Sequence, residues 1–378
     1  MNILHITTYL QGGAGKIIKD ISFFQNKAGN NIFVVTTDAE EAGYCNYKEY
    51  IDFLMKTNIK VTKVDSTFKR DIYLNLKAVD DVRNIIINED IDIIHAHAAV
   101  PAMIGIIARA GMGKYIPVIQ TMHGWGTNKR LVQENMDVTI MNGLDKIVSV
   151  SKSDKQLMVS KGISCNKITT IYNGIEDNSK NEYFDDEIIN DINLYKSNGY
   201  IVFGSIGSIC KRKNQELLID ALSSLPSDIK YFFVLIGEGE DIISLQNKVK
   251  KYKLDGKVKF YNYRKDANKY IKLFDYLLFT SISEGFSITV LEGFRERVPI
   301  IASDINAFTE CIENNKTGYL FESESATSLS ELLLKIKDKN WNTSVIENAY
   351  KKFKNEFTLM EMMKKYDELY INILELKG

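Results

Sequence analysis

The sequence predicts an α/β protein made of two domains, each with a parallel β-sheet covered by helices on both faces. The first observation is length, because 378 residues exceed the size of one typical hydrophobic core. The second is that short apolar runs alternate with amphipathic segments almost throughout, which is typical of parallel sheets. The third is a polar, acidic, Asn-rich stretch at 176–199 that separates two such sets. We therefore place the domain boundary near residue 176.

Strands and helices follow from the periodicity of apolar residues along the chain. Helical segments such as 16–28 and 76–88 lie between the strands of the first set, and the last part of the chain, 345–376, is also helical in pattern. The predicted strands are 3–7, 31–36, 91–95, 117–121 and 146–150 in the first domain, and 200–206, 231–237, 258–261, 276–280 and 299–302 in the second.

Composition excludes several classes of protein. The formal net charge is −1, so no general electrostatic field attracts nucleic acid. The four cysteines are scattered without a C-x-x-C spacing, which fits a reducing compartment. The apolar run 93–108 is too short and interrupted to span a bilayer, and the opening residues form a strand pattern with no signal peptide. We expect a cytoplasmic protein, and 20 basic against 17 acidic residues through position 175 permit peripheral contact with the inner membrane face.

The most informative segment runs from Ser283 to Gly293 and contains two glutamates, Glu284 and Glu292. If a helix begins near Phe286, the backbone N–H groups around Phe286, Ser287 and Ile288 are free to bind an anion. Glu284 would precede this helix, and Glu292 would lie about two turns along it. An anion site flanked by carboxylates suits a ligand with phosphates and many hydroxyl groups, such as a nucleotide sugar.

This segment resembles the Glu-x7-Glu signature of retaining GT-B glycosyltransferases of the family-four, or group 1, type. The continuation through Ser303 and the Asn-Lys-Thr-Gly-Tyr-Leu-Phe sequence ending at Phe321 are similar to the same family. The resemblance implies two Rossmann-like domains facing each other across a cleft. It implies an acceptor-side domain at 1–175, a nucleotide-sugar domain at 176–355 and a C-terminal helix, 356–378, that packs back on the first domain.

Three features of the first domain are candidates for the site. The glycine-rich turn from Gly12 to Gly15 follows the first strand and resembles the family's first loop, with Gly13 and Gly15 near the donor. His95 and His97 project from one face at a strand end, where a hydrogen-bonded role is favoured over a metal site. His123 ends the fourth predicted strand, and the resemblance implies that it contacts the donor sugar near C6. The alternative for His123 is a loop-stabilising role.

In the second domain, Lys213 falls on the lysine that neutralises the diphosphate in the family. The family's arginine position is occupied by Ser208, which removes a bidentate phosphate ligand. Arg212 or Lys211 is a candidate replacement. The Gly237-Glu238-Gly239 turn and Arg264, which lies where the family contacts the nucleobase, carry weaker signals. The segment from Ile171 to Ile175 resembles the family's hinge strand, with an ordinary Asn173-Gly174 turn as the alternative, and is interpreted as architectural.

The resemblance implies transfer of a sugar from a nucleoside diphosphate sugar, by preference a UDP-sugar, to a hydroxyl acceptor with retention of configuration. Lys213 and the helix amides would stabilise the leaving diphosphate, Glu292 would bind the ribose, and Glu284 with His123 would bind the sugar. No metal cofactor is expected. The acceptor would be a saccharide, a lipid-linked saccharide or a protein glycan. The alternatives are a non-catalytic GT-B subunit that stabilises a partner transferase and a nicotinamide-dependent oxidoreductase, which the missing G-x-G-x-x-G disfavours.

Overall fold

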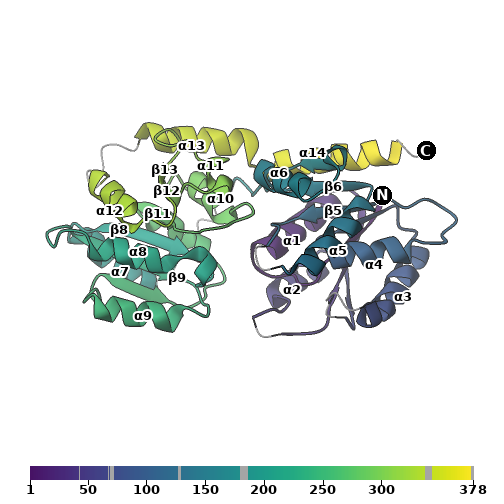
Figure 1. Cartoon of the computed structure of the whole chain (residues 1–378), viewed down its shortest axis with the longest axis horizontal. Coiled ribbons are helices and arrows are strands. Elements are labelled where there is room, and N and C mark those ends of the chain that lie inside the picture. Colours follow the sequence, from purple (N-terminus) through teal and green to yellow (C-terminus); the bar gives the residue numbers. More distant parts are fainter. Residues whose placement is uncertain are drawn as a thin grey trace. The chain divides into compact units, whose positions relative to one another are not determined.

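The computed structural model describes residues 1–41, 43–66, 68, 72–126, 129–178, 186–336 and 343–375. The chain forms two compact units (Figure 1). Unit 1 contains Met1–Asn173 together with Met360–Gly378, and unit 2 contains Gly174–Leu359. The units therefore divide between Asn173 and Gly174, where the sequence suggested a boundary after residue 175.

Unit 1 is built on a parallel sheet with the strand order β3-β2-β1-β4-β5-β6-β7 among the described residues. The sequence did not predict β3 and β7, which are the two edge strands. β3 is mostly exposed and polar, and β7 has three residues, so neither carries a strong apolar pattern. The strands are β1 (Asn2–Ile6), β2 (Asn31–Thr37), β3 (Lys60–Val64), β4 (Ile93–Ala96), β5 (Val118–Met122), β6 (Lys146–Ser149) and β7 (Ile168–Thr170).

Helices cover this sheet and bury its apolar side chains. The last of them, α14, presents Met362, Tyr366, Tyr370 and Ile373 at helical spacing, and all four side chains are buried. Figure 1 shows α14, in yellow, beside the strands of unit 1. No helix in the described ranges combines the length and apolar character needed to cross a membrane. The helices are α1 (Gly12–Lys27), α2 (Lys48–Lys56), α3 (Ile72–Asn88), α4 (Ala99–Ala108), α5 (Leu131–Asn142), α6 (Lys152–Ser160), the 3₁₀ turn η1 (Cys165–Lys167) and α14 (Leu359–Glu375).

Unit 2 repeats the architecture with a parallel sheet of order β10-β9-β8-β11-β12-β13 within its described part. Its strands are β8 (Ile201–Ile206), β9 (Tyr231–Ile236), β10 (Val258–Tyr261), β11 (Tyr276–Phe279), β12 (Ile300–Ser303) and β13 (Tyr319–Phe321). Its helices are α7 (Glu187–Ser197), η2 (Lys211–Lys213), α8 (Gln215–Ser223), α9 (Ile242–Lys251), η3 (Ala267–Leu273), α10 (Ile288–Arg295), α11 (Asn306–Thr309), α12 (Ala326–Lys335) and α13 (Thr343–Glu356).

Helix α7 corrects the interpretation of 176–199 as a polar connecting stretch. Asp186 caps the helix by accepting a hydrogen bond from the Ile189 N–H at 3.1 Å. Ile188 and Ile192, four residues apart, are both buried. Burial of these two apolar side chains is enough to hold the helix in place. Two apolar residues barely change the composition of the stretch, so its sequence did not indicate a helix. Residues 179–185 of this stretch lie outside the described ranges.

The two chain segments that connect the units lie side by side. Ile175 and Thr358 form an isolated parallel bridge, and the Leu359 N–H donates to the Ile175 carbonyl at 2.8 Å. A Cβ atom on Gly174 would lie 2.3 Å from the Thr358 carbonyl oxygen. Glycine is therefore required here by close backbone packing, which supports the architectural interpretation of the Asn173-Gly174 turn.

Both sheets have a point where the strand order reverses. In unit 1 it lies between β1 and β4, and in unit 2 between β8 and β11. In sheets of this kind the connecting loops diverge at the reversal point, which leaves a crevice for ligands at the carboxyl ends of the strands. These two reversal points are therefore where ligand-binding residues are expected.

Candidate functional site

A cluster of charged residues lies at the reversal point of unit 2. Glu284 follows β11, and its Oε1 lies 2.5 Å from Lys213 Nζ, while its Oε2 lies 2.8 Å from Arg212 Nη1. The Ser281 hydroxyl also donates to Glu284 Oε1 at 2.8 Å. The structure thus brings together three residues that the sequence assigned separately to the diphosphate and the sugar.

Backbone hydrogen bonds hold the two loops of this cluster together. The Ile282 N–H donates to the Arg212 carbonyl, and the Thr280 hydroxyl donates to the Lys213 carbonyl, both at 2.9 Å. Asn214 adopts a left-handed conformation, with φ of 50°, between η2 and α8. This turn ends η2 at Lys213, next to the end of the neighbouring strand β11.

The cluster carries a net positive charge. Glu284 is ionised: burial acts to raise its pKa, but the charges of Lys213 and Arg212 outweigh this effect and hold the pKa below its usual value. One carboxylate therefore faces two cationic side chains. The side chains of Lys213 and Arg212 are 17% and 42% exposed, so both can be reached by a ligand. Such an arrangement can bind an anion.

The structure distinguishes between the two residues proposed to replace the missing arginine. Ser208 is exposed, with its hydroxyl 3.8 Å from the Cys210 sulfur. Arg212 lies at Glu284 beside Lys213, and its Nη1 also donates to the Ser283 carbonyl at 2.9 Å. Lys211 is exposed and forms no ion pair with any described residue. Arg212 is therefore the better candidate.

Helix α10 begins at Ile288, later than the start near Phe286 that the sequence suggested. Ser287 is the N-cap residue but makes no side-chain capping bond, so its hydroxyl does not satisfy the first helical N–H groups. Phe286 and Ile288 are buried, and the Phe286 ring packs 5.5 Å from that of Phe357. Because of the later start, Glu292 lies in the second turn, and only 6% of it is exposed.

The two weaker candidates of unit 2, the turn from Gly237 to Gly239 and the side chain of Arg264, lie in different environments. A Cβ atom on Gly237 or Gly239 would lie 1.9 Å from a carbonyl oxygen of the loop after β8, so these glycines are required by packing. Glu238 between them accepts a hydrogen bond from the Tyr263 N–H at 3.2 Å. Arg264 is exposed after β10, an edge strand two places from β8, and pairs with no carboxylate in the described chain. The structure does not join it to the charged cluster.

In unit 1, the glycine-rich turn follows β1 and opens α1, next to the reversal point. Gly12 has a φ of +57°, and Gly13 is exposed at the start of α1. A Cβ atom on Gly15 would lie 2.5 Å from the Leu10 carbonyl carbon, so only glycine allows this close approach. Gly15 is thus explained by packing, whereas Gly13 is open to a ligand.

All four histidines of the chain gather at the same reversal point. His5 Nδ1 lies 3.0 Å from His97 Nε2, and His97 Nδ1 lies 3.1 Å from His123 Nε2. His95 contacts the Thr121 hydroxyl at 2.8 Å through Nε2 and the Tyr370 hydroxyl at 2.6 Å through Nδ1. The sequence predicted the pairing of His95 with His97 on one face but not the participation of His5.

The partners of this histidine cluster come from distant parts of the sequence. Gln25 on α1 contacts His5 Nε2 at 2.8 Å, and Tyr366 on α14 contacts the Thr121 hydroxyl at 2.9 Å. Sequence reasoning missed Gln25, Tyr366 and Tyr370, because on their own helices they look like ordinary residues of a buried face.

The histidine cluster has the size of a metal site but is organised by hydrogen bonds. One nitrogen each of His5, His95 and His97 lie within 4.8 Å of one another. Each of these rings, however, uses both nitrogens in contacts with protein groups. A metal ion would have to replace those contacts. Burial lowers the pKa of His5 and of His123 to about 4, and those of His95 and His97 well below 6.5, so the rings are neutral at pH 7.

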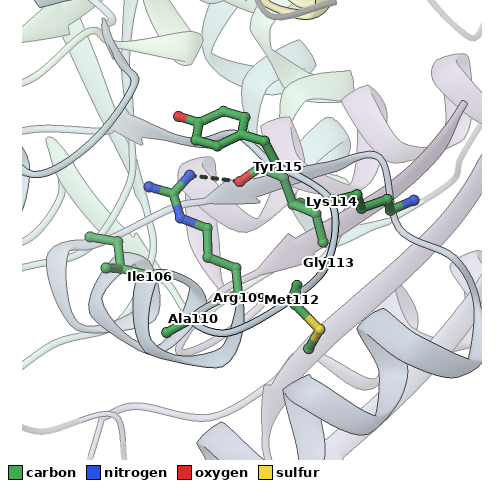
Figure 2. A pocket seen from close by; sticks show the side chains of 8 residues that line it. Ile106, Arg109, Ala110, Met112, Gly113, Lys114 and Tyr115 are labelled. Atoms are coloured by element: carbon green, nitrogen blue, oxygen red, sulfur yellow. Dashed lines mark hydrogen bonds between the residues drawn. The ribbon is translucent and has the colours of Figure 1, made fainter.

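Unit 1 also has a surface hollow of about 360 Å³, and Figure 2 shows the side chains that line it. It is lined by the end of α4 and the segment that enters β5, at the amino end of that strand. Its main polar group, Arg109, donates to the Ile116 carbonyl at 2.6 Å and pairs with Asp145 at 2.7 Å. Because Arg109 is already satisfied, the hollow is not a second candidate site.

Comparison with known families assigns both halves of the chain. Residues 11–179 match the family described as Glycosyltransferase Family 4, and residues 186–352 match the Glycosyl transferases group 1 family. Together the two matches cover most of the chain, which confirms the resemblance seen in the Glu-x7-Glu segment.

Individual proteins agree with this assignment. The chain is 26% identical over 291 residues to the O-antigen biosynthesis glycosyltransferase WclY of Escherichia coli, covering 75% of this chain and 79% of that protein. It is 24% identical over 329 residues to the UDP-Gal:alpha-D-GlcNAc-diphosphoundecaprenol alpha-1,3-galactosyltransferase of Escherichia coli, covering 82% and 83%.

A solved structure gives the fold. The Anabaena protein HepE in complex with UDP and glucose matches with a TM-score of 0.80 at 20% identity, covering 98% of this chain and 100% of that one. The fold class predicted from the sequence is confirmed. From its two parallel sheets, the two family matches and these relatives, the chain belongs to the group 1 glycosyltransferases of the GT-B fold.

Proposed function

We propose that this glycosyltransferase moves a sugar from a UDP-sugar to a hydroxyl group of a saccharide or glycolipid, with retention of the anomeric configuration. The observation that carries the proposal is the pair of cations, Lys213 and Arg212, held by Glu284 at the reversal point of unit 2. A nucleoside diphosphate supplies the anion that this site can bind.

In this proposal Lys213, Arg212 and the first amides of α10 stabilise charge on the leaving diphosphate. Glu292 binds the ribose hydroxyl groups, and Glu284 contacts the transferred sugar. His123 and the exposed part of the glycine-rich turn, at Gly13, belong to the sugar pocket. Phe286 and Ile288 contribute backbone amides only, since their side chains are buried.

The donor class is supported by relatives. HepE was solved with UDP and glucose, and the galactosyltransferase of Escherichia coli is named for a UDP-sugar donor and a lipid-linked acceptor. A role in surface polysaccharide or glycolipid synthesis fits the named functions of the relatives. The non-catalytic subunit is less well supported, because Arg212 supplies a second cation despite Ser208.

We also propose that the protein works in the cytoplasm with peripheral contact at the inner membrane face. Leu131 and Val132 at the start of α5 are 72% and 68% exposed and follow directly after Arg130. Exposed apolar groups beside a basic residue can dock on an anionic bilayer. Co-sedimentation with anionic but not neutral vesicles is expected, and equal sedimentation with both would contradict an electrostatic contribution.

The function is tested by incubating the purified chain with a panel of nucleotide sugars and following release of nucleoside diphosphate. We expect hydrolysis or transfer with at least one UDP-sugar and thermal stabilisation by UDP. NMR of the anomeric proton in the isolated product reports the stereochemistry. No turnover of any donor, with or without candidate acceptors, would favour the non-catalytic subunit.

Glu292→Ala is expected to raise the Michaelis constant for the donor and to weaken UDP binding. Hydrogen bonds between ribose hydroxyl groups and a charged acceptor are worth about 1.5–3 kcal/mol each. Calorimetric titration with UDP measures the loss, and Glu331→Ala, which removes an exposed glutamate of α12, is the control. Unchanged UDP affinity in a folded Glu292→Ala protein would remove Glu292 from the site.

Glu284→Gln is expected to reduce turnover at least tenfold, about 1.4 kcal/mol, without weakening UDP binding. The substitution removes the carboxylate that competes with phosphate for Lys213 and Arg212, so UDP affinity should stay equal or increase. Steady-state kinetics and calorimetry separate the two effects, with Glu331→Gln as the control. Weaker UDP binding by Glu284→Gln would show that Glu284 contributes to the nucleotide site itself.

Catalysis is expected to persist after treatment with EDTA. In the proposed site, cationic side chains and helix N–H groups stand where metal-dependent enzymes place a divalent ion. The measurement is donor turnover before and after chelation and dialysis. Loss of turnover that Mg²⁺ or Mn²⁺ restores would contradict a metal-free reaction.

A further inference from the structure

Four side chains of unit 1 form a continuous row of hydrogen bonds that ends at His123. Gln25 Oε1 lies 2.8 Å from His5 Nε2, His5 Nδ1 lies 3.0 Å from His97 Nε2, and His97 Nδ1 lies 3.1 Å from His123 Nε2. His5 and His97 each contact the preceding residue of the row through one ring nitrogen and the following residue through the other. At the end of the row, His123 Nδ1 is shielded from solvent and has no hydrogen-bond partner among the described residues.

The amide oxygen of Gln25 determines the direction of the whole row. A carbonyl oxygen only accepts, so His5 must carry its proton on Nε2. A neutral imidazole has one N–H, so His5 Nδ1 accepts from His97 Nε2–H. By the same rule His97 Nδ1 accepts from His123 Nε2–H. The remaining nitrogen, His123 Nδ1, then presents a lone pair.

The hydrogen bond of the Gln25 side chain is the one with His5, in which the amide oxygen faces His5 Nε2. The amide nitrogen, Gln25 Nε2, is buried and has no hydrogen-bond partner among the described residues. The Tyr370 hydroxyl on the neighbouring helix bonds to His95 Nδ1 at 2.6 Å and is not part of the row.

We propose that Gln25, His5 and His97 are positioning residues that hold His123 in its Nε2–H tautomer, so that His123 Nδ1 accepts a hydrogen bond from a hydroxyl group of the transferred sugar. The inference rests on the proposed function in one respect, the contact of His123 with the donor sugar. The tautomers themselves follow from the hydrogen-bonded row alone. The low pKa values of the four rings support a neutral row at pH 7.

The direction of the hydrogen bonds in the row determines which group of a sugar His123 Nδ1 can bind. An acceptor nitrogen selects a group that carries a proton, such as a sugar hydroxyl. A carboxylate at the same place, as in a hexuronic acid, would offer only lone pairs and repel the nitrogen. This contact therefore favours a donor sugar that presents a hydroxyl group to His123 over one that presents a carboxylate there. His123 also has no proton on Nδ1 to give, so it binds the sugar without acting there as a general acid.

The tautomers are tested directly by NMR of the full chain labelled with ¹⁵N-histidine, in the absence of any donor. With four histidines in the sequence, two-bond ¹H–¹⁵N spectra resolve every ring, and single His→Gln variants assign the signals. We expect His5, His97 and His123 to be Nε2–H tautomers. A proton on Nδ1 of His123 would overturn the inference, whatever the enzyme's activity.

The contact with the sugar is tested by kinetics with a set of UDP-sugars that each lack one hydroxyl group, and with the matching UDP-hexuronate. For the wild type, one deoxy donor and the hexuronate should lose at least tenfold in kcat/KM. His97→Leu should lose at least tenfold with the complete donor, should no longer discriminate against that deoxy donor, and should bind UDP normally.

Two further variants separate positioning from folding. His97→Gln provides both a donor and an acceptor and should retain the discrimination. His95→Gln changes a ring outside the row, bonded to Thr121 and Tyr370, and should leave the discrimination and the His123 tautomer unchanged. Full discrimination in a folded His97→Leu protein would overturn the positioning role. Failure of every UDP-sugar as a donor would instead refute the proposed function, while the NMR result would still decide the tautomers.

Discussion

Arg212→Ala is expected to lower kcat/KM for the nucleotide sugar by well over tenfold, which corresponds to more than about 1.4 kcal/mol of transition-state stabilisation. The expectation rests on the contact of the Arg212 guanidinium with Glu284, next to Lys213. When a diphosphate enters, the two cations can turn from the carboxylate to the phosphate oxygens, where negative charge increases during transfer. Removing one cation lowers that stabilisation while leaving Lys213 in place.

The neighbouring Lys211 provides a matched control. Lys211→Ala removes the same charge from the same turn, but Lys211 is exposed and outside the charged cluster, so activity should stay close to that of the wild type. Ser208→Arg in the Arg212→Ala background should recover part of the loss by restoring a guanidinium at the family's usual position. Robust transfer by a protein lacking both Lys211 and Arg212 would show that Lys213 and the amides of α10 are sufficient.

Unit 1 is expected to lose stability as the pH falls from about 6.5 toward 4, while unit 2 does not show this loss. The pKa values of His5 and His123 lie near 4 in the folded protein, and those of His95 and His97 also lie well below 6.5. Unfolded histidines bind protons below pH 6.5, whereas the folded ones do not. The unfolded state therefore takes up more protons, and stability decreases by on the order of 1 kcal/mol per histidine and pH unit.

For the four histidines together, the decrease in folding stability at pH 5 is on the order of several kcal/mol. This is a large fraction of the stability of a typical domain. Hydrogen exchange followed by mass spectrometry, corrected for intrinsic rates, measures the two units in one experiment. Peptides from β1 and β4 should lose protection at pH 5, and peptides from β8 and β9 serve as the internal control, because residues 174–359 contain no histidine. A parallel loss in both units would show that another group dominates.

Much of this protein is determined by its local sequence. The central strands are continuous apolar runs because both of their faces are buried, and this made them predictable. The Glu284-to-Glu292 segment indicated the family because its carboxylates have a fixed spacing around a helix start. The edge strands β3, β7 and β13 and the helix α7 were missed, since each is short or buries few side chains and leaves a weak pattern.

The tertiary structure alone decided which side chains meet. Arg212 was separated from Lys211 as a candidate because backbone bonds between the loops after β8 and β11 place it at Glu284. His5, His97 and His123 lie on three different strands or strand ends, and Gln25 lies on a helix, so their row has no sequence spacing that could reveal it. Residue types and local periodicity specify strands, helices and family, whereas contacts between distant segments arise only when the parallel sheet brings the carboxyl ends of its strands to one edge.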